Sequence, residues 1–251
     1  MTGGPVQSID GTPQCPVCPG GEQSFMVRAN EYDVWRCSVC RSAYVPGLKS
    51  NEDLAAMYAD AYHGATTGYF TKIDKKMRRA RGRIKQLRRF MPCGRFLDIG
   101  CNGGFVVEAA REAGYDAWGV EVDGVSLNYA REHYPENGYY HGLVETFAPK
   151  EGFDLIYSSE VIEHVPEVRA FVAAITRLLN PGGHVYLTTP DISHWRRPKD
   201  IFKWDGFCPP VHVTYFTPES LRGLLENQGL EFIKKSWAFK PGMKIIARRP
   251  D

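Results

Sequence analysis

The sequence lacks any long, uninterrupted hydrophobic run. A helix that crosses a bilayer needs about 18 to 20 consecutive apolar residues, so no membrane span is expected. Residues 1–11 have neither a basic start nor an apolar stretch, so they do not resemble a secretory signal. Internal repeats and low-complexity tracts are also missing. These absences favour a globular protein of the cytoplasm, with no membrane partner.

A strong excess of one charge is also missing, because 31 Lys and Arg face 29 Asp and Glu, for a net charge of +2. The distribution is uneven, since Lys72–Arg89 holds ten basic residues and one acidic residue. Such a block is compatible with a surface that binds phosphate, in RNA or in an anionic small substrate. The plainer interpretation is a solvated helix face, with Met77, Ile84 and Leu87 as its apolar anchors.

The seven cysteines of a chain without a secretory signal argue against a disulfide framework. Four of them form two Cys-x-x-Cys pairs, Cys15 with Cys18 and Cys37 with Cys40, separated by 18 residues. Four thiolates at this spacing are typical of a tetrahedral zinc site. Redox dithiols and unrelated thiols are the alternatives. A closed four-thiolate site has no open coordination position, so the predicted zinc is structural.

Alternating residues between the two cysteine pairs predict two short strands within Ser24–Arg36, joined at Ala29-Asn30-Glu31. A module of this size buries little apolar surface, so the metal is expected to supply most of its folding free energy. The sequence therefore predicts a small zinc ribbon at the N-terminus.

Beyond the ribbon, short apolar runs alternate with helical patterns, which predicts a parallel sheet covered by helices on both faces. Two helices, Leu54–Ala61 and Ile73–Phe90, precede this alternation and flank a turn-rich break at Gly64–Gly68. The expected strands are Arg95–Ile99, Ala117–Val122, Tyr139–Val144, Phe153–Ser158 and His184–Thr189, and the expected helices are Phe105–Ala113, Val125–His133 and Val168–Leu179.

The C-terminal pattern differs, with a helix over Pro218–Gln228 that Thr217 caps. Two strand-like runs follow, Glu231–Phe239 and Lys244–Arg249, and the Pro-Gly turn between them predicts an antiparallel pair. We expect three segments: a zinc ribbon with a leader over 1–48, a helical linker or cap over 49–92, and a ligand-binding α/β domain over 93–251.

The first strand of the α/β pattern runs into a glycine turn, Gly100-Cys101-Asn102-Gly103-Gly104, and a helix follows at once. Ligands of open α/β sheets bind at this edge. Asn102 departs from the Gly-x-Gly-x-x-Gly pattern of dinucleotide folds. Asp98 would repel a pyrophosphate but suits a cationic ligand such as an ammonium or sulfonium group. Glu121, or Asp123 in its place, ends the second strand and can accept ribose hydroxyls, although acidic residues there also cap helices.

These motifs closely resemble those of class I S-adenosylmethionine-dependent methyltransferases, above all a bacterial zinc-ribbon subgroup related to the ubiquinone-biosynthesis O-methyltransferases. The resemblance covers nearly the whole chain. The segments that carry it are Leu97–Gly104, the strand end at Glu121, Phe153–His164, Leu178–Gly183, His212, the helix start at Phe216–Leu221, and Pro46, Tyr58 and Tyr62.

The resemblance implies a Rossmann-like α/β sheet of seven strands in the order 3-2-1-4-5-7-6, with strand 7 antiparallel. It also implies S-adenosylmethionine as cofactor, with Gly100–Gly104 around its methionine part and Glu121 on its ribose. Val144 or Glu145 would lie near the adenine, and Ser158 and Ser159 near the sulfonium. The cofactor-binding set is Asp98, Gly100, Cys101, Asn102, Gly104, Glu121, Val122, Val144, Glu145, Ser158 and Ser159.

Methyl transfer to a hydroxyl or amine requires removal of a proton, and histidine is the side chain best suited to take it near neutral pH. Among His164, His194 and His212, we expect His212 to be the base and His164 to be the second choice. Each is also compatible with a structural, hydrogen-bonded role. Glu163 is a candidate to orient His164 or to bind a metal ion. The aromatic and proline-rich segment Asp191–Val213 is expected to be a lid over the acceptor, or else to pack over the end of the sheet.

Three functions follow from the residues. The first is methylation of oxygen, nitrogen or carbon on a small molecule, such as a sugar or a natural-product intermediate. The second is methylation of RNA gripped by the ribbon and the basic block, although the ribbon is not notably basic and the block lacks aromatics for base stacking. The third is a cofactor-binding scaffold without turnover, which the set Asp98, Gly100 and Glu121 disfavours.

Overall fold

The computed structural model describes residues 13–47 and 72–251. The expected helix Leu54–Ala61, the break at Gly64–Gly68, and Tyr58 and Tyr62 lie outside this range. The described residues form two compact units. The first unit contains residues 13–47, 160–173 and 187–247, and the second contains residues 72–159, 174–186 and 248–251. Neither unit is one continuous stretch of chain, and the three-segment division stays a prediction.

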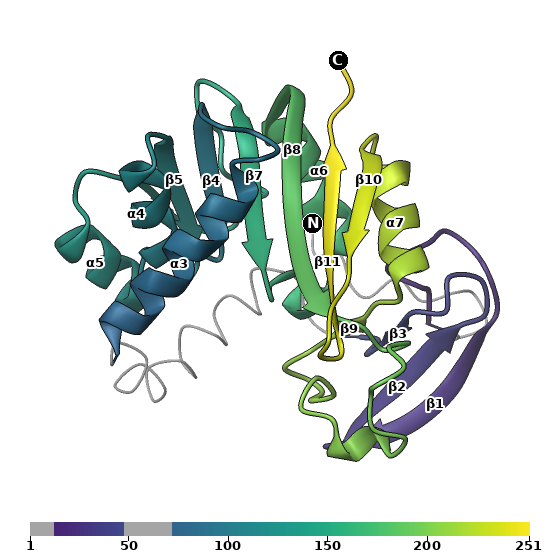
Figure 1. Ribbon diagram of the computed structural model, residues 1–251. Coiled ribbons are helices and arrows are strands. Elements are labelled where there is room, and N and C mark those ends of the chain that lie inside the picture. The colour runs from purple at the N-terminus through teal and green to yellow at the C-terminus, as the bar shows by residue number, and fades with distance from the viewer. Residues whose placement is uncertain (1–12, 48–71) are drawn as a thin grey trace. The chain divides into compact units, whose positions relative to one another are not determined.

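A seven-stranded sheet carries the α/β part of the chain (Figure 1), in the order β10-β11-β8-β7-β4-β5-β6. The strands β4, β5, β6 and β7 are parallel where they pair. Counted along the α/β pattern, this is the expected order 3-2-1-4-5-7-6, which is confirmed. The short connection between β10 and β11 makes these two strands antiparallel, as Figure 1 draws them. The bounds are β4 Arg95–Ile99, β5 Asp116–Glu121, β6 Gly138–His141, β7 Phe153–Ser159, β8 Leu179–Pro190, β10 Glu231–Ser236 and β11 Gly242–Arg248.

The helices form where the apolar spacing predicts them. They are α3 Ile73–Leu87, α4 Phe105–Glu112, α5 Gly124–His133, α6 Val168–Leu178 and α7 Pro218–Asn227. Thr217 caps α7 by accepting the Ser220 N–H at 3.1 Å. The strand expected at His184–Thr189 begins earlier, at Leu179. Its extra residues pair with the chain end, because the Gly182 N–H donates to the Arg249 carbonyl at 3.0 Å.

The basic helix α3 buries one apolar stripe, formed by Met77, Ala80, Ile84 and Leu87. Most of its Lys and Arg side chains face outward, and Arg81 forms an ion pair with Glu112 at 2.6 Å. These positions agree with the plainer interpretation of the basic block, a solvated face over apolar anchors.

The first unit contains a four-stranded sheet in the order β1-β2-β3-β9. Its strands are β1 Gln23–Ala29, β2 Tyr32–Cys37, β3 Ala43–Tyr44 and β9 Thr214–Tyr215. The expected hairpin is present, since β1 and β2 pair through a two-residue turn with Asn30 at φ 49° and Glu31 at φ 69° (Figure 1). Positive φ at both turn residues fits the twist of such hairpins.

The strand β9 joins the ribbon sheet although it lies far along the sequence, with Tyr44 opposite Thr214. The segment Asp191–Val213 that precedes β9 packs in part against the ribbon strands. Trp204 and Phe207 are buried in one cluster with Val34 and Tyr215, whereas Trp195 is 73% exposed. Packing therefore accounts for two of the aromatic residues in this segment, and a lid role for the remainder stays a prediction.

Among the helices that the structure describes, none is both long enough and apolar enough to cross a bilayer.

Candidate functional site

Three of the expected cofactor residues lie at the carboxyl ends of neighbouring parallel strands in the second unit. Ile99 of β4 pairs with Val120 of β5 on one side and with Ser158 of β7 on the other. Asp98, Glu121 and Ser158 therefore lie along the same edge of the sheet, which is where open α/β sheets bind ligands.

The glycine turn after β4 has the backbone that its sequence predicts. Gly100, Asn102 and Gly104 all have positive φ, at 75°, 48° and 75°. Asparagine tolerates this left-handed region better than most residues, which explains why Asn102 can replace a glycine here. A Cβ atom on Gly104 would lie 2.8 Å from the Tyr139 hydroxyl oxygen, so only glycine fits where α4 begins. The departure from the dinucleotide pattern thus leaves the tight turn intact.

Glu121 is held at the strand end by backbone donors. Its Oε1 accepts the N–H groups of Val122 at 2.8 Å and Asp123 at 3.0 Å, and its Oε2 accepts that of Asn102 at 2.8 Å. Asp123 instead caps α5, accepting the N–H groups of Val125 and Ser126. Both carboxylates therefore accept backbone N–H groups, and the assignment of the ribose hydroxyls to Glu121 stays a prediction.

Asp98 is a buried carboxylate, 3% exposed. Burial raises the pKa of Asp98 well above its usual range, with the Arg83 charge opposing and the Glu121 charge adding to the shift. Close by on the same edge, the Ser158 hydroxyl is buried and has no hydrogen-bond partner among the described residues. Two acidic groups and an unpartnered hydroxyl fit a ligand that is cationic and polar, as S-adenosylmethionine is.

The remaining cofactor candidates lie on or beside the same strands. Cys101 and Val144 are buried, and Ser159 ends β7. The Arg177 guanidinium donates to the Val144 and Glu145 carbonyls at 3.5 and 3.3 Å, which fixes the segment expected near the adenine. The contacts of these residues with a cofactor stay predictions, as do those of Gly100, Val122 and Gly104.

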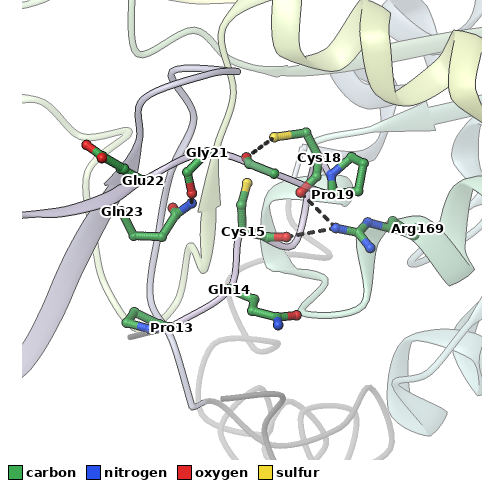
Figure 2. A pocket seen from close by; sticks show the side chains of 10 residues that line it. Pro13, Gln14, Cys15, Cys18, Pro19, Gly21, Glu22, Gln23 and Arg169 are labelled. Carbon is green, nitrogen blue, oxygen red and sulfur yellow. Dashed lines mark hydrogen bonds between the residues drawn. The ribbon is translucent and has the colours of Figure 1, made fainter. Parts of the chain in front are cut away.

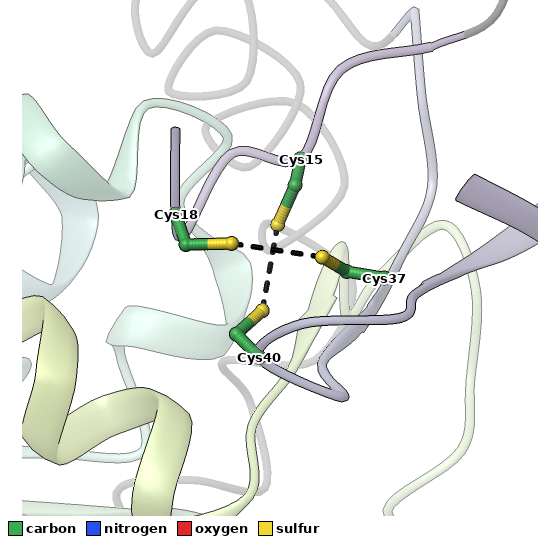
Figure 3. Close-up of side chains that lie close together, drawn as sticks. All are labelled: Cys15, Cys18, Cys37 and Cys40. Carbon is green, nitrogen blue, oxygen red and sulfur yellow. Dashed lines mark hydrogen bonds between the residues drawn. The ribbon is translucent and has the colours of Figure 1, made fainter. Parts of the chain in front are cut away.

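The four predicted metal-binding cysteines come together in the first unit (Figure 3), with their sulfur atoms all within 4.8 Å of one another. The Sγ atoms of Cys15 and Cys40 are 3.6 Å apart, as are those of Cys18 and Cys37. Four sulfurs placed tetrahedrally about 2.3 Å from one zinc ion would be about 3.8 Å apart. The arrangement therefore fits a zinc ion with very little movement.

The thiols also perturb one another. A hydrogen bond with Cys40 and burial raise the pKa of Cys15, whereas the same hydrogen bond lowers the pKa of Cys40 to about 5. Four thiolates in this space would repel one another without a cation, so the donor set matches a soft divalent metal.

Arg169, which the sequence analysis did not single out, contacts the first cysteine knuckle (Figure 2). It lies in the first turn of α6 and donates from one nitrogen to the Cys15 and Cys18 carbonyls at 2.8 and 2.9 Å. With Gln14 and Gly20 it lines a pocket beside the knuckle. No sequence signal pointed to it, since a lone arginine early in a helix is common.

We expect Arg169→Ala to loosen the first knuckle, because two carbonyl groups lose a charged donor. A hydrogen bond to a charged group contributes about 1.5 to 3 kcal/mol, less where solvent screens it. Zinc should therefore pass to a chromogenic chelator several-fold faster than from the unaltered protein. Arg222→Ala is the matched control, since Arg222 pairs with its helix neighbour Glu226 at 2.8 Å and lies over the Phe232 ring. Equal release rates in both variants would contradict the role of Arg169.

The expected catalytic residues form a second cluster in the first unit. One ligand-type atom from each of Glu163, His164 and His212 lies within 4.8 Å of the other two. Glu163 and His164 belong to a single 3-10 turn, Ile162–His164, and the Val213 N–H donates to the Glu163 carbonyl at 2.8 Å. The two imidazole rings meet edge to face, with centroids 4.7 Å apart. The structure thus brings together all three residues.

Burial governs the ionisation of this cluster. It lowers the pKa of His164 to about 4, with the His212 charge adding to the shift, and it lowers the pKa of His212. Burial and the nearby Glu160 charge raise the pKa of Glu163 to about 8. Both imidazoles are therefore neutral near pH 7, the state in which a nitrogen lone pair can accept a proton or bind a metal ion.

The sequence and the fold were compared with those of known proteins. A family model described as a methyltransferase domain matches residues 69–235. The chain belongs to this methyltransferase family. It is related to the ubiquinone biosynthesis O-methyltransferases of Idiomarina loihiensis, 38% identical over 147 residues (56% of each chain), and of Dinoroseobacter shibae, 33% identical over 163 residues (59% of this chain and 64% of the relative).

The methyltransferase spans between 42% and 64% of the length of the first four curated relatives that it matches. Its fold also matches the crystal structure of the 1,6-didemethyltoxoflavin-N1-methyltransferase of Burkholderia thailandensis, with a TM-score of 0.60 and 16% identity. That match covers 84% of this chain and 96% of the other. The expected class I α/β fold is confirmed, and the four-cysteine cluster at its N-terminus is consistent with the expected zinc ribbon.

Proposed function

We propose that this chain transfers the methyl group of S-adenosylmethionine to a hydroxyl or amine of a small-molecule acceptor. The observation that carries the proposal is the acidic sheet edge, where Asp98 and Glu121 lie at the same strand ends as the Ser158 hydroxyl, which has no hydrogen-bond partner among the described residues. This edge suits a cationic sulfonium ligand with ribose hydroxyls, and no phosphate-binding pattern accompanies it. Asp98, Glu121 and the glycine turn would hold the cofactor, which supplies an electrophilic methyl group when bound.

Because the chain's own residues must orient the acceptor and remove its proton, we assign that task to the cluster of Glu163, His164 and His212. His212 is the first choice and His164 the second for direct proton transfer. The same nitrogen atoms are also suited to a metal ion that would acidify the acceptor.

Two observations support a small molecule, and not RNA, as the acceptor. The relatives are named for the biosynthesis of a small molecule, ubiquinone. The ion pair of Arg81 with Glu112 places a negative charge beside the basic face of α3, which makes that face less suited to RNA phosphates. We further propose that Cys15, Cys18, Cys37 and Cys40 hold a structural zinc ion. The cytoplasmic location and the segment boundaries 1–48, 49–92 and 93–251 stay predictions.

The test is incubation of the purified chain with trideuteromethyl-labelled S-adenosylmethionine and a host-cell extract. Products are separated by size and analysed by mass spectrometry. We expect the label in the small-molecule fraction, where it also gives the acceptor's mass. Label in RNA, lost when the exposed Arg78, Arg79 and Lys85 are changed to Gln, would favour the RNA methyltransferase instead. Cofactor binding without labelled product in either fraction would favour a non-catalytic scaffold.

A further inference from the structure

His212, the first choice for the base, lies in a segment that contains neither helix nor strand over residues 206–213, which we call the histidine loop. The His212 Nδ1 lies 2.9 Å from the Gly206 carbonyl, and the His212 N–H donates to the Cys208 carbonyl at 3.1 Å. A carbonyl oxygen only accepts, so Nδ1 carries the proton of the neutral ring and Nε2 carries the lone pair that a base needs. The direction of that lone pair therefore depends on where the backbone of the histidine loop lies.

The first contact that fixes the histidine loop from outside comes from Asn30, which is 179 residues away from its partner in the sequence. Asn30 begins the turn between β1 and β2, and its Nδ2 donates to the Pro209 carbonyl at 2.8 Å. The turn itself requires only a positive φ, which is 49° at Asn30 and which glycine adopts equally well. The side-chain bond is therefore not needed for the hairpin. It connects the ribbon to the histidine loop, shortly before His212.

Tyr215 of β9 makes the second contact. Its ring is buried in one cluster with Val34 and Val45 of the ribbon, and its backbone lies opposite Ala43 of β3. Its hydroxyl donates to the His212 carbonyl at 2.9 Å. The ring of Tyr215 thus packs in the core of the ribbon, while its hydroxyl holds the backbone of His212.

The third contact is a chain of backbone hydrogen bonds through Val213, the residue after His212. The Val45 N–H donates to the Val213 carbonyl at 2.9 Å, and the Val213 N–H donates to the Glu163 carbonyl at 2.8 Å. Val213 therefore joins the ribbon to the turn Ile162–His164, which carries the other two candidate catalytic residues. All of these residues belong to the first unit.

We propose that the ribbon positions His212 for proton transfer, with Asn30 and Tyr215 as the positioning residues. Both side chains act on the backbone of the histidine loop, so neither needs to touch the acceptor. A base must lie within hydrogen-bond reach of the proton it removes, and a displacement of about 1 Å slows such a step by about one hundredfold. The inference rests on the proposed function, in which His212 is the base.

The same contacts give the predicted zinc a role beyond folding. Zinc would stabilise the hairpin and β3, and the contacts with the histidine loop begin there. The position of His212 would then depend on a metal site that has no open coordination position and takes no part in the chemistry.

The ionisation of His212 reports the position of the loop without any turnover. Burial lowers the pKa of His212, and a loosened loop would expose the ring to water. The pKa should then rise towards its ordinary value of about 6.5. The titratable groups that face His212 are the same in every variant used below, and they are Glu160, Glu163, His164 and Cys208.

The experiment compares Asn30→Gly and Tyr215→Phe with the unaltered full chain. Asn30→Gly keeps the positive φ of the turn, and Tyr215→Phe keeps the packed ring. We expect kcat for methyl transfer to fall about tenfold to one hundredfold, with the KM for S-adenosylmethionine and the zinc content unchanged. In spectra of the 15N-histidine-labelled chain, assigned with His212→Gln, the pKa of His212 should rise and the tautomer protonated at Nδ1 should become less dominant.

Two matched controls make the same chemical changes elsewhere. Glu31→Gly alters the other residue of the hairpin turn, whose φ is 69°. Tyr115→Phe removes a buried hydroxyl that donates to the Met91 carbonyl in the second unit. Both controls should keep the kcat and the His212 pKa of the unaltered chain. Equal losses in the controls and in the two variants would mean that general destabilisation causes them, and would overturn the proposal.

An unchanged His212 pKa in both Asn30→Gly and Tyr215→Phe would also overturn the proposal, whether or not kcat falls. Methyl transfer by the unaltered chain would then still support the proposed function. If no chain transfers a methyl group, the histidine spectra decide separately. A raised His212 pKa in these two variants alone would support positioning by the ribbon and contradict the proposed function.

Discussion

Replacing Glu121 with Gln is expected to weaken S-adenosylmethionine binding by about tenfold to one hundredfold. The loss of a hydrogen bond to a charged acceptor amounts to about 1.5 to 3 kcal/mol, and each 1.4 kcal/mol is a factor of about ten. Three backbone N–H groups already contact this carboxylate, from Asn102, Val122 and Asp123. The ribose hydroxyls would donate to the same carboxylate oxygens. The neutral amide of the Glu121→Gln variant is a weaker acceptor for both the ribose and the backbone N–H groups. Isothermal titration with S-adenosylmethionine and S-adenosylhomocysteine measures the change.

The matched control for this prediction is Asp123→Asn, two residues further on. Asparagine is as good a helix cap as aspartate, so the bonds from Val125 and Ser126 to the residue at 123 should survive. Cofactor affinity should then change by less than about threefold, well under 1 kcal/mol. The reverse ranking, with weak cofactor binding only in Asp123→Asn, would show that Asp123 binds the ribose instead of Glu121. Thermal unfolding of both variants separates a loosened turn from a lost ligand contact.

The sheet could be predicted because its strands carry local signals. The apolar run of β4 ends at Ile99, glycines follow it, and a helical pattern begins at Phe105. This order predicts a strand, a tight turn and a helix. The acidic residues follow from the same logic, since side chains after parallel strands meet at one edge. The helix cap could not be assigned from the sequence, because Glu121 and Asp123 are both acidic residues near one strand end, and only Asp123 caps α5.

Other features depend on contacts between distant parts of the sequence, which local patterns do not encode. The strands β3 and β9 have two residues each, too short for any periodicity, yet Ala43 pairs with Tyr215. The bond from the Asn30 side chain to the Pro209 carbonyl at 2.8 Å is equally invisible in the sequence. The candidate histidines were chosen by residue type and loop position, and the carbonyl partner of each ring became known only from the fold.

Substituting Ser for Cys37 is expected to abolish zinc retention in the ribbon and to unfold its knuckles. Structural zinc sites contribute about 10 to 16 kcal/mol of apparent binding free energy near neutral pH, far more than so small an apolar core. The remaining thiols of Cys15, Cys18 and Cys40 should then react with an alkylating agent at least about one hundredfold faster. Mass spectrometry of the alkylated peptides measures each thiol separately, and Cys93, which is exposed, reacts throughout as an internal standard.

The effect of Cys37→Ser should extend beyond the cysteines, because the ribbon sheet includes β9. Tyr44 of β3 pairs with Thr214, and the Val45 N–H donates to the Val213 carbonyl at 2.9 Å. Hydrogen exchange at residues 213–215 should therefore accelerate together with exchange in β1 and β2. Cys93→Ser, the control, should leave both regions protected. Faster exchange in β1 and β2 with β9 still protected would contradict this prediction. It would mean that residues outside the ribbon keep β9 folded, and that zinc stabilises only the β1–β2 hairpin.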